Sequence, residues 1–158
     1  MKNIKNGIQW RNIKLLLIAL PFFLIFAVFN TKYGRIQSEK EGEYIRSIGL
    51  NLQGKVIEKA EFNAGHNYGV IYLELYQSNI KLFDDRDNQE KHIGLIKNDK
   101  AEIIFNAMSQ IKIGDSISIE NDQYHIYRMG KLIYNWPLSL GGDSMYRQYE
   151  RELRKIEM

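Results

Sequence analysis

The chain has 158 residues, of which 44% are hydrophobic and 26% charged, and it contains no cysteine. This length suits one domain, and the large hydrophobic share excludes disorder over the whole chain. The missing thiols exclude disulfide frameworks, cysteine-based zinc sites and cysteine nucleophiles.

The net charge of +3 belongs to the N-terminus. Residues 1–30 carry four basic side chains and no acidic one, whereas the rest of the chain carries 18 basic and 19 acidic side chains. A nucleic-acid-binding domain needs its basic residues on the folded body, where they displace counterions from phosphates. The sequence therefore predicts no nucleic-acid binding.

An unbroken apolar run from Leu15 to Phe29 follows the basic start. At about 1.5 Å per residue the run is shorter than a bilayer core of about 30 Å, so the expected transmembrane span extends over residues 13–31. No pair of small residues typical of a signal-peptidase site ends the run, which favours an uncleaved signal anchor over a cleaved signal or a buried core helix. The basic flank predicts a single-pass protein of the inner (cytoplasmic) membrane, with its N-terminus in the cytoplasm and its body periplasmic or extracellular.

The sequence divides into four segments. The cytoplasmic N-terminus and signal anchor occupy residues 1–33, and a polar stalk of mixed charge occupies residues 34–50. Over residues 51–140, short apolar segments alternate with Gly, Asn and Asp, which predicts a β-rich extracytoplasmic domain. Residues 141–158 are expected to form an amphipathic C-terminal helix.

Strands are expected at residues 52–62, 68–76, 80–83 and 93–97. In the second of these, Ile71, Leu73 and Leu75 alternate with tyrosines, so that apolar side chains line one face. Residues 99–111 fit a short helix capped by Asp99, although alternation in the same segment also fits a strand. The helix is our prediction for this segment.

The segment after residue 110 predicts a β-hairpin with a defined register. With Asn121-Asp122 as a two-residue loop, apolar residues face one another on one side of the two strands. The expected pairs on that side are Ile119 with Tyr124, Ile117 with Ile126, and Asp115 with Arg128, while Ser116, Ser118, His125 and Tyr127 share the other side. A second turn at Gly130-Lys131 leads into a strand over 132–136, and Pro137 stops that strand or leaves it on an edge. This order of elements predicts a mainly β fold, a small OB-like or Greek-key barrel with one short internal helix.

Asp143 or Ser144 is expected to cap the C-terminal helix, which would run to about Ile156. Its apolar stripe consists of Tyr146, Tyr149, Leu153 and Ile156. A helix of about 13 residues is marginal alone in water, so the stripe must dock. We expect it to dock on the open end of its own barrel, with a partner protein as the alternative.

The tetrapeptide Gly114-Asp115-Ser116-Ile117 matches the opening block of GDSL-type esterases, in which the serine is the nucleophile. That family places the block at the start of an α/β domain and ends with an Asp-x-x-His that completes the triad. Here a hairpin follows the block, and no histidine follows His125. We therefore interpret the block as a tight turn that starts a strand, with a small serine hydrolase as the alternative function.

The arrangement resembles a loose group of small exported proteins, common in Bacteroidota, that carry a membrane segment or lipid anchor. The matching residues are Gly54-Lys55-Val56, Ile111 with the Gly114–Ile117 block, and Tyr127-Arg128. The resemblance implies an exported β-rich domain and supplies no catalytic residue.

Other candidate sites are weaker. His66, His92 and His125 lie on three separate segments, which does not predict a zinc site. The acidic loop with Asp84, Asp85, Asp87 and Glu90 lacks the central glycine and terminal glutamate of a calcium loop, and we interpret it as a solvated tip. Tyr68, Tyr72 and Tyr76 could stack on sugar or peptide, but tyrosine is also a common residue of half-buried strands.

The sequence thus predicts no catalytic, cofactor-binding or metal-binding residue and no enzyme. We expect a membrane-anchored interaction or envelope-associated module. Its partners would be the membrane, through residues 13–31, and a protein bound by the C-terminal helix or the tyrosine-bearing strand face.

Overall fold

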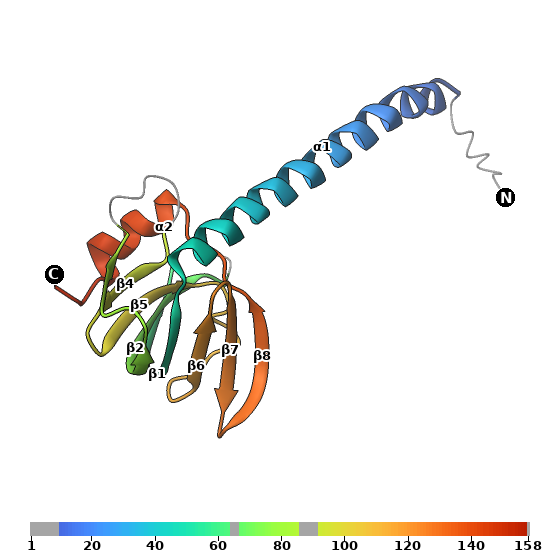
Figure 1. Ribbon diagram of the computed structural model, residues 1–158. Helices are drawn as coiled ribbons and strands as arrows, with labels where there is room; N and C mark the ends of the chain where they lie inside the picture. The colour runs from blue at the N-terminus through green and yellow to red at the C-terminus, as the bar shows by residue number, and fades with distance from the viewer. Residues whose placement is uncertain (1–9, 64–66, 86–91, 158) are drawn as a thin grey trace. The chain divides into compact units, whose positions relative to one another are not determined.

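The computed structural model describes residues 10–63, 67–85 and 92–157 (Figure 1). Side chains outside this description are those of residues 10–19 and of Phe22, Leu24, Ala27, Gln37, Ser38 and Asp143. The chain divides into two compact units, Met1–Lys40 and Glu41–Met158. The helix α1, Trp10–Ile48, continues through the boundary between them.

The helix α1 contains the apolar run of the sequence. Between Leu20 and Ile36, its large apolar side chains with described positions are exposed, with Phe23 at 73% and Phe29 at 70%. Within the described part of the chain, no helix has both the length and the apolar character that crossing a bilayer requires. The predicted span 13–31 lies partly outside that description, because the side chains of residues 10–19 do not belong to it.

The last turns of α1 belong to the folded body. Ile45 is completely buried in the core, and Arg46 forms an ion pair with Asp122. Gly49 ends the helix with a φ of +63° and donates its N–H to the Arg46 carbonyl at 3.0 Å. Glycine adopts this left-handed conformation without strain, so the chain can turn directly into the first strand.

The body is an eight-stranded antiparallel sheet. Its strands are β1 (Asn51–Glu61), β2 (Gly69–Ser78), β3 (Leu82–Asp84), β4 (Gly94–Lys97), β5 (Lys100–Phe105), β6 (Ser116–Glu120), β7 (Gln123–Arg128) and β8 (Lys131–Pro137). They are ordered β3-β4-β5-β2-β1-β6-β7-β8. The four strands expected over residues 52–97 are thereby confirmed.

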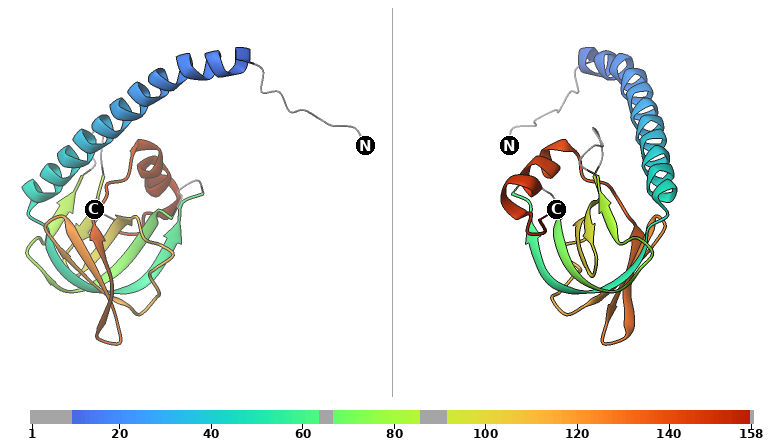
Figure 2. Two further views of the ribbon diagram at one scale, coloured as in Figure 1. Left: turned by 90° about the vertical axis from the view of Figure 1, so that its right-hand side faces the viewer. Right: turned by 60° about the vertical axis from the view of Figure 1, so that its left-hand side comes forward.

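The sheet curves strongly around the main core (Figure 2). Phe105 on β5 and Tyr124 on β7 have ring centroids 4.4 Å apart, although β2, β1 and β6 separate their strands in the sheet. We call the face that carries this core the inner face. Ile71, Leu73 and Leu75 lie on it, as the alternation in the second strand predicts.

The predicted closed barrel is wrong. In the described chain the outer strands β3 and β8 do not pair with each other, so the sheet stays open. Residues from connecting segments also belong to the main core, and these are Ala107, Met108, Ile111, Leu138 and Leu140. The open sheet therefore buries its inner face partly against loops.

The predicted helix over 99–111 is also wrong, because Lys100–Phe105 is the strand β5. Ala101, Ile103 and Phe105 pack into the main core, and Ile104 packs on the opposite face. A strand buried on both faces shows a continuous apolar run, which periodicity alone does not distinguish from a helix. Asn98, with a φ of +56°, makes the turn that pairs Lys97 with Lys100.

The hairpin register is confirmed. Ile119 pairs with Tyr124, Ile117 with Ile126, and Ser118 with His125 across the Asn121-Asp122 loop. The second turn lies one residue earlier than expected, at Met129 and Gly130, whose φ values of +50° and +74° suit a two-residue hairpin turn. Pro137 ends β8, which is an edge strand, as predicted.

The C-terminal segment packs on the outer face of the sheet, opposite the main core. It comprises α2 (Asp143–Gln148) and a π-helical turn η1 (Tyr149–Leu153), so the helix ends earlier than the predicted Ile156. Gly142 is the N-cap, in place of the predicted Asp143 or Ser144. Tyr146 and Tyr149 are buried with Phe62, Val70, Tyr72 and Ile104. The expected docking on the chain's own body is confirmed, with the sheet face in place of a barrel end.

Candidate functional site

A groove lies on the outer face over β1, β6 and β7, and we call it the outer-face groove. It has a volume of about 250 Å³. It is lined by Gln53, Tyr76, Ser116, Ile117, Ser118, Glu120 and Tyr127. Alternation along β6 explains its floor: Ile117 and Ile119 point into the core, which leaves the short side chains of Ser116 and Ser118 on the outer face.

Aromatic side chains form the walls of the groove. On β7, His125 and Tyr127 have ring centroids 6.4 Å apart and are stacked. On β2, Tyr76 is 63% exposed. Tyr76 stands in a β-bulge, because Gln53 pairs with Gln77 and Gly54 pairs with Leu75, which leaves Tyr76 between two register positions. A bulge of this kind redirects a side chain relative to its neighbours.

Gly54 is required by the backbone at this bulge. A Cβ at position 54 would lie 2.8 Å from the Glu74 carbonyl oxygen, closer than carbon and oxygen pack. The local sequence therefore fixes the bulge, and the bulge positions Tyr76 at the groove.

The Gly114–Ile117 block does not form an esterase nucleophile turn. Ser116 begins the strand β6, whereas the esterase serine stands on a turn from strand to helix. Among the described residues, no hydrogen bond joins Ser116 to a histidine. Asp115 is engaged elsewhere, since it accepts from Arg128 Nε at 2.9 Å and Nη2 at 2.7 Å.

Asp115 and Arg128 pair as the hairpin register predicts, but the burial of Asp115 was not predicted. Asp115 is only 3% exposed, and its carboxylate also accepts from the Lys112 N–H at 2.8 Å. Burial alone would raise the pKa of Asp115, but the hydrogen bonds from Arg128 and Lys112 outweigh it and hold the pKa below its usual value. This pair therefore fastens the start of β6 to the end of β7.

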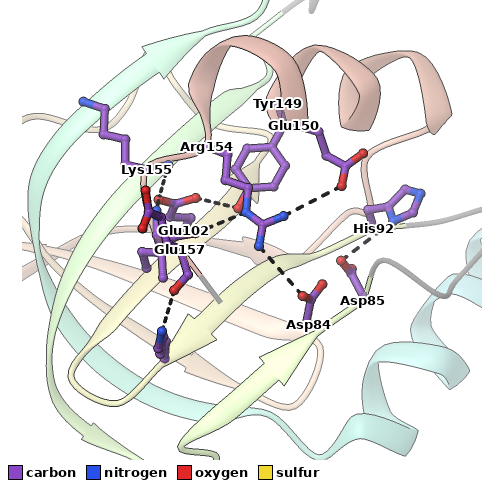
Figure 3. Close-up of polar contacts among 11 residues, drawn as sticks. Asp84, Asp85, His92, Glu102, Tyr149, Glu150, Arg154, Lys155 and Glu157 are labelled. Atoms are coloured by element: carbon purple, nitrogen blue, oxygen red, sulfur yellow. Dashed lines mark hydrogen bonds and ion pairs between the residues drawn. The ribbon is translucent and has the colours of Figure 1, made fainter.

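A second group of polar side chains lies beneath the C-terminal segment (Figure 3). Its centre is Glu102, which is 1% exposed. Glu102 accepts from the Tyr149 hydroxyl at 2.5 Å and from the backbone N–H groups of Lys155 and Ile156 at 2.8 and 2.7 Å. Burial, and next the hydrogen bond to Glu102, raise the pKa of Tyr149. The carboxylate thus holds both η1 and the extended tail on the sheet.

Further charged contacts surround this centre. Arg154 lies 4.0 Å from Asp84 and 3.9 Å from Glu150. Asp85 lies 3.7 Å from His92, whose ring stacks on Tyr146 at 3.5 Å. Burial raises the pKa of Asp85 despite the N–H donors of Ile93 and Gly94. These contacts connect the β3–β4 region to the C-terminal segment.

The other candidate sites are not assembled in the described part of the chain. His66, Asp87 and Glu90 lie outside the described residues. Among those that are described, no group of three His, Asp or Glu side chains could hold a metal ion. His92 lies under the C-terminal segment, and His125 lies beside Tyr127.

The three tyrosines of the second strand have different surroundings. Tyr72 is buried and donates its hydroxyl to the Leu153 carbonyl, and burial, with the nearby Glu102 and Glu58 carboxylates, raises its pKa to about 12. Tyr68 hydrogen-bonds to Ser139 at 2.7 Å. Tyr76 alone of these three lines the outer-face groove.

Alternation in the hairpin places Ser116, Ser118, His125 and Tyr127 on one face, but no local pattern indicates Gln53 or Tyr76, which come from strands far away in the sequence. The role of Glu102 was not predicted either. The signal for that residue was a single carboxylate inside the apolar run Ala101–Phe105. A buried carboxylate requires hydrogen-bond donors, which here arrive from residues about 50 positions later.

Comparison with known proteins gives no relative: no family model, curated protein or solved structure matches the chain.

Proposed function

We propose that this chain is a single-pass membrane protein whose body, outside the cytoplasm, is a non-catalytic binding module of the cell envelope. The anchor is residues 13–31, with the basic N-terminus retained in the cytoplasm. The exposed apolar side chains along α1, such as Phe23 and Phe29, support this anchor, because exposed aromatic side chains of this size are stable in a lipid environment.

The binding role is supported by a contrast between two sets of polar groups in the body, those that hold the fold together and those that line the groove. The buried carboxylates of Glu102 and Asp115 each accept several hydrogen bonds that hold the fold together. The polar side chains that line the outer-face groove lie beside the rings of Tyr76 and Tyr127 instead. Binding sites combine a hollow, aromatic surface and a few convergent polar groups in this way.

The alternative function is a small serine hydrolase that uses Ser116. Against it stand the strand position of Ser116 and the engagement of Asp115 with Arg128. We expect no labelling of the protein by a fluorescent serine-reactive phosphonate, and no change in any measured ester hydrolysis on Ser116→Ala. Ser118→Ala is the matched control, since this serine lies two residues away on the same face. Phosphonate labelling that Ser116→Ala abolishes and Ser118→Ala retains would establish the hydrolase.

A further inference from the structure

The outer-face groove extends over several neighbouring strands of the sheet. Its walls stand on β1, β2 and β7, and its floor is β6. Strands in a sheet are about 4.8 Å apart, so β1 and β7 lie about 10 Å from each other across β6. Because Ser116 and Ser118 are small, this space remains open along the strand.

The polar side chains in the groove can form hydrogen bonds with hydroxyl groups. Ser116, Ser118 and Tyr127 each offer a hydroxyl that both donates and accepts, and Gln53 offers an amide. Glu120 offers acceptors and already accepts from Ser118 at 3.4 Å. Each hydroxyl of a vicinal diol can donate and accept, so a diol can bond to several of these groups together.

The exposed ring of Tyr76 supplies an apolar surface. The C–H groups on one side of a pyranose ring pack on such a ring while the hydroxyl groups at the edge remain available for hydrogen bonds. The bulge at Gly54 places this ring at the groove, so the stacking surface is built into the sheet. Tyr127 provides a second ring on the opposite wall.

Charged side chains of both signs lie near the groove. Glu120 lies at one end of the β6 floor, and Lys55, the β1 partner of Ser116 and the register partner of Glu74 on β2, lies near the other end. An anionic polymer would meet the Glu120 carboxylate and a cationic one would meet Lys55. The ligand that fits both ends is uncharged.

We propose that the outer-face groove binds an uncharged oligosaccharide chain, with one pyranose ring stacked on Tyr76 and its hydroxyl groups bonded to Ser116, Ser118, Gln53 and Glu120. This proposal rests on the proposed binding role and names the ligand class of the groove.

The test is calorimetric titration of the full chain in lipid nanodiscs with three probes, maltohexaose, cellohexaose and N-acetylchitohexaose. Nanodiscs are used in place of detergents that carry sugar headgroups, because such headgroups would compete with the probes for the groove. We expect at least one probe to bind, and Tyr76→Ala and Ser116→Phe each to weaken it at least tenfold. Tyr76→Ala removes the stacking surface, and Ser116→Phe fills the floor.

Trp136→Ala is the matched control, because Trp136 is 56% exposed on β8 and does not line the groove. It should leave the affinity unchanged, and melting curves of all variants should show folded protein. Failure of all three probes to bind, or equal binding by the groove variants and the wild type, would overturn the sugar proposal. The membrane location and the serine labelling are measured in separate experiments, so failure of the sugar proposal would leave the outcome of both unchanged.

Discussion

Truncation after Gly142 is expected to lower the free energy of unfolding of the body by at least about 5 kcal/mol. The truncation removes Tyr146 and Tyr149, and loss of one large buried aromatic side chain costs about 3–5 kcal/mol. It also leaves the Glu102 carboxylate without Tyr149, Lys155 and Ile156, and a buried carboxylate without donors adds to the loss. Since domains have a total stability of about 5–15 kcal/mol, the thermal melt should fall sharply or disappear.

Two smaller changes keep this prediction measurable if the truncated chain does not fold. Tyr149→Phe retains the ring and removes the hydroxyl donor to Glu102, so we expect a loss of about 1–3 kcal/mol. Truncation after Ile156 keeps the three donors to Glu102 and should cost less than about 0.5 kcal/mol. An unchanged melt after removal of residues 143–158, together with the loss of a co-purifying protein, would show that the helix serves a partner instead.

Asp115→Ala is expected to lower the free energy of unfolding by about 2–4 kcal/mol at neutral pH. An exposed cross-strand ion pair would contribute at most about 1 kcal/mol. The Asp115 side chain, however, is only 4% exposed, and its carboxylate accepts from Arg128 and from the Lys112 N–H. Removing the buried carboxylate takes away both hydrogen bonds from Arg128 and the one from the Lys112 N–H, which costs more than an exposed ion pair contributes. Chemical denaturation at pH 7 measures the difference.

The effect of Asp115→Ala should depend on pH. Because the folded protein holds the Asp115 pKa below its unfolded value, the stabilisation is complete above the unfolded pKa, about 3.9, and is lost as the pH falls through the folded pKa. Wild type and variant should therefore converge in stability below about pH 4. The control is Glu39→Ala, which breaks the exposed Arg35–Glu39 pair and should cost less than about 0.5 kcal/mol at every pH. A constant difference between wild type and Asp115→Ala down to pH 2 would contradict the ion-pair explanation.

Local pattern was sufficient to predict the β6–β7 hairpin. Its alternation has period two, and Asn121, with a φ of +57°, occupies the turn that the register requires. The same reasoning failed for β5, because Ile104 and Ile103 are buried on opposite faces by elements far apart in the sequence. The alternation that identifies a half-buried strand is absent there.

Long-range packing explains the remaining differences. Loop residues such as Met108 and Leu140 fill part of the core of the open sheet, and no local pattern indicates their burial. The groove likewise needs Tyr76 from β2 beside Ser116 from β6, and a bulge brings them to one surface. The serine floor could be predicted from the hairpin alone, whereas its aromatic wall on β2 could not.

The most direct test of the proposed membrane arrangement uses the absence of cysteine in the chain. Met129→Cys and Lys5→Cys each introduce a single thiol, the first in the body at a side chain that is 99% exposed and the second in the basic N-terminus. Intact cells are treated with a membrane-impermeant maleimide, and membranes are then extracted with alkaline carbonate. We expect the full-length chain in the membrane pellet, with Met129→Cys labelled in intact cells and Lys5→Cys labelled only after lysis. Labelling of Lys5→Cys alone in intact cells, labelling of both only after lysis, or a soluble product that starts after residue 29 would contradict the anchor and its orientation.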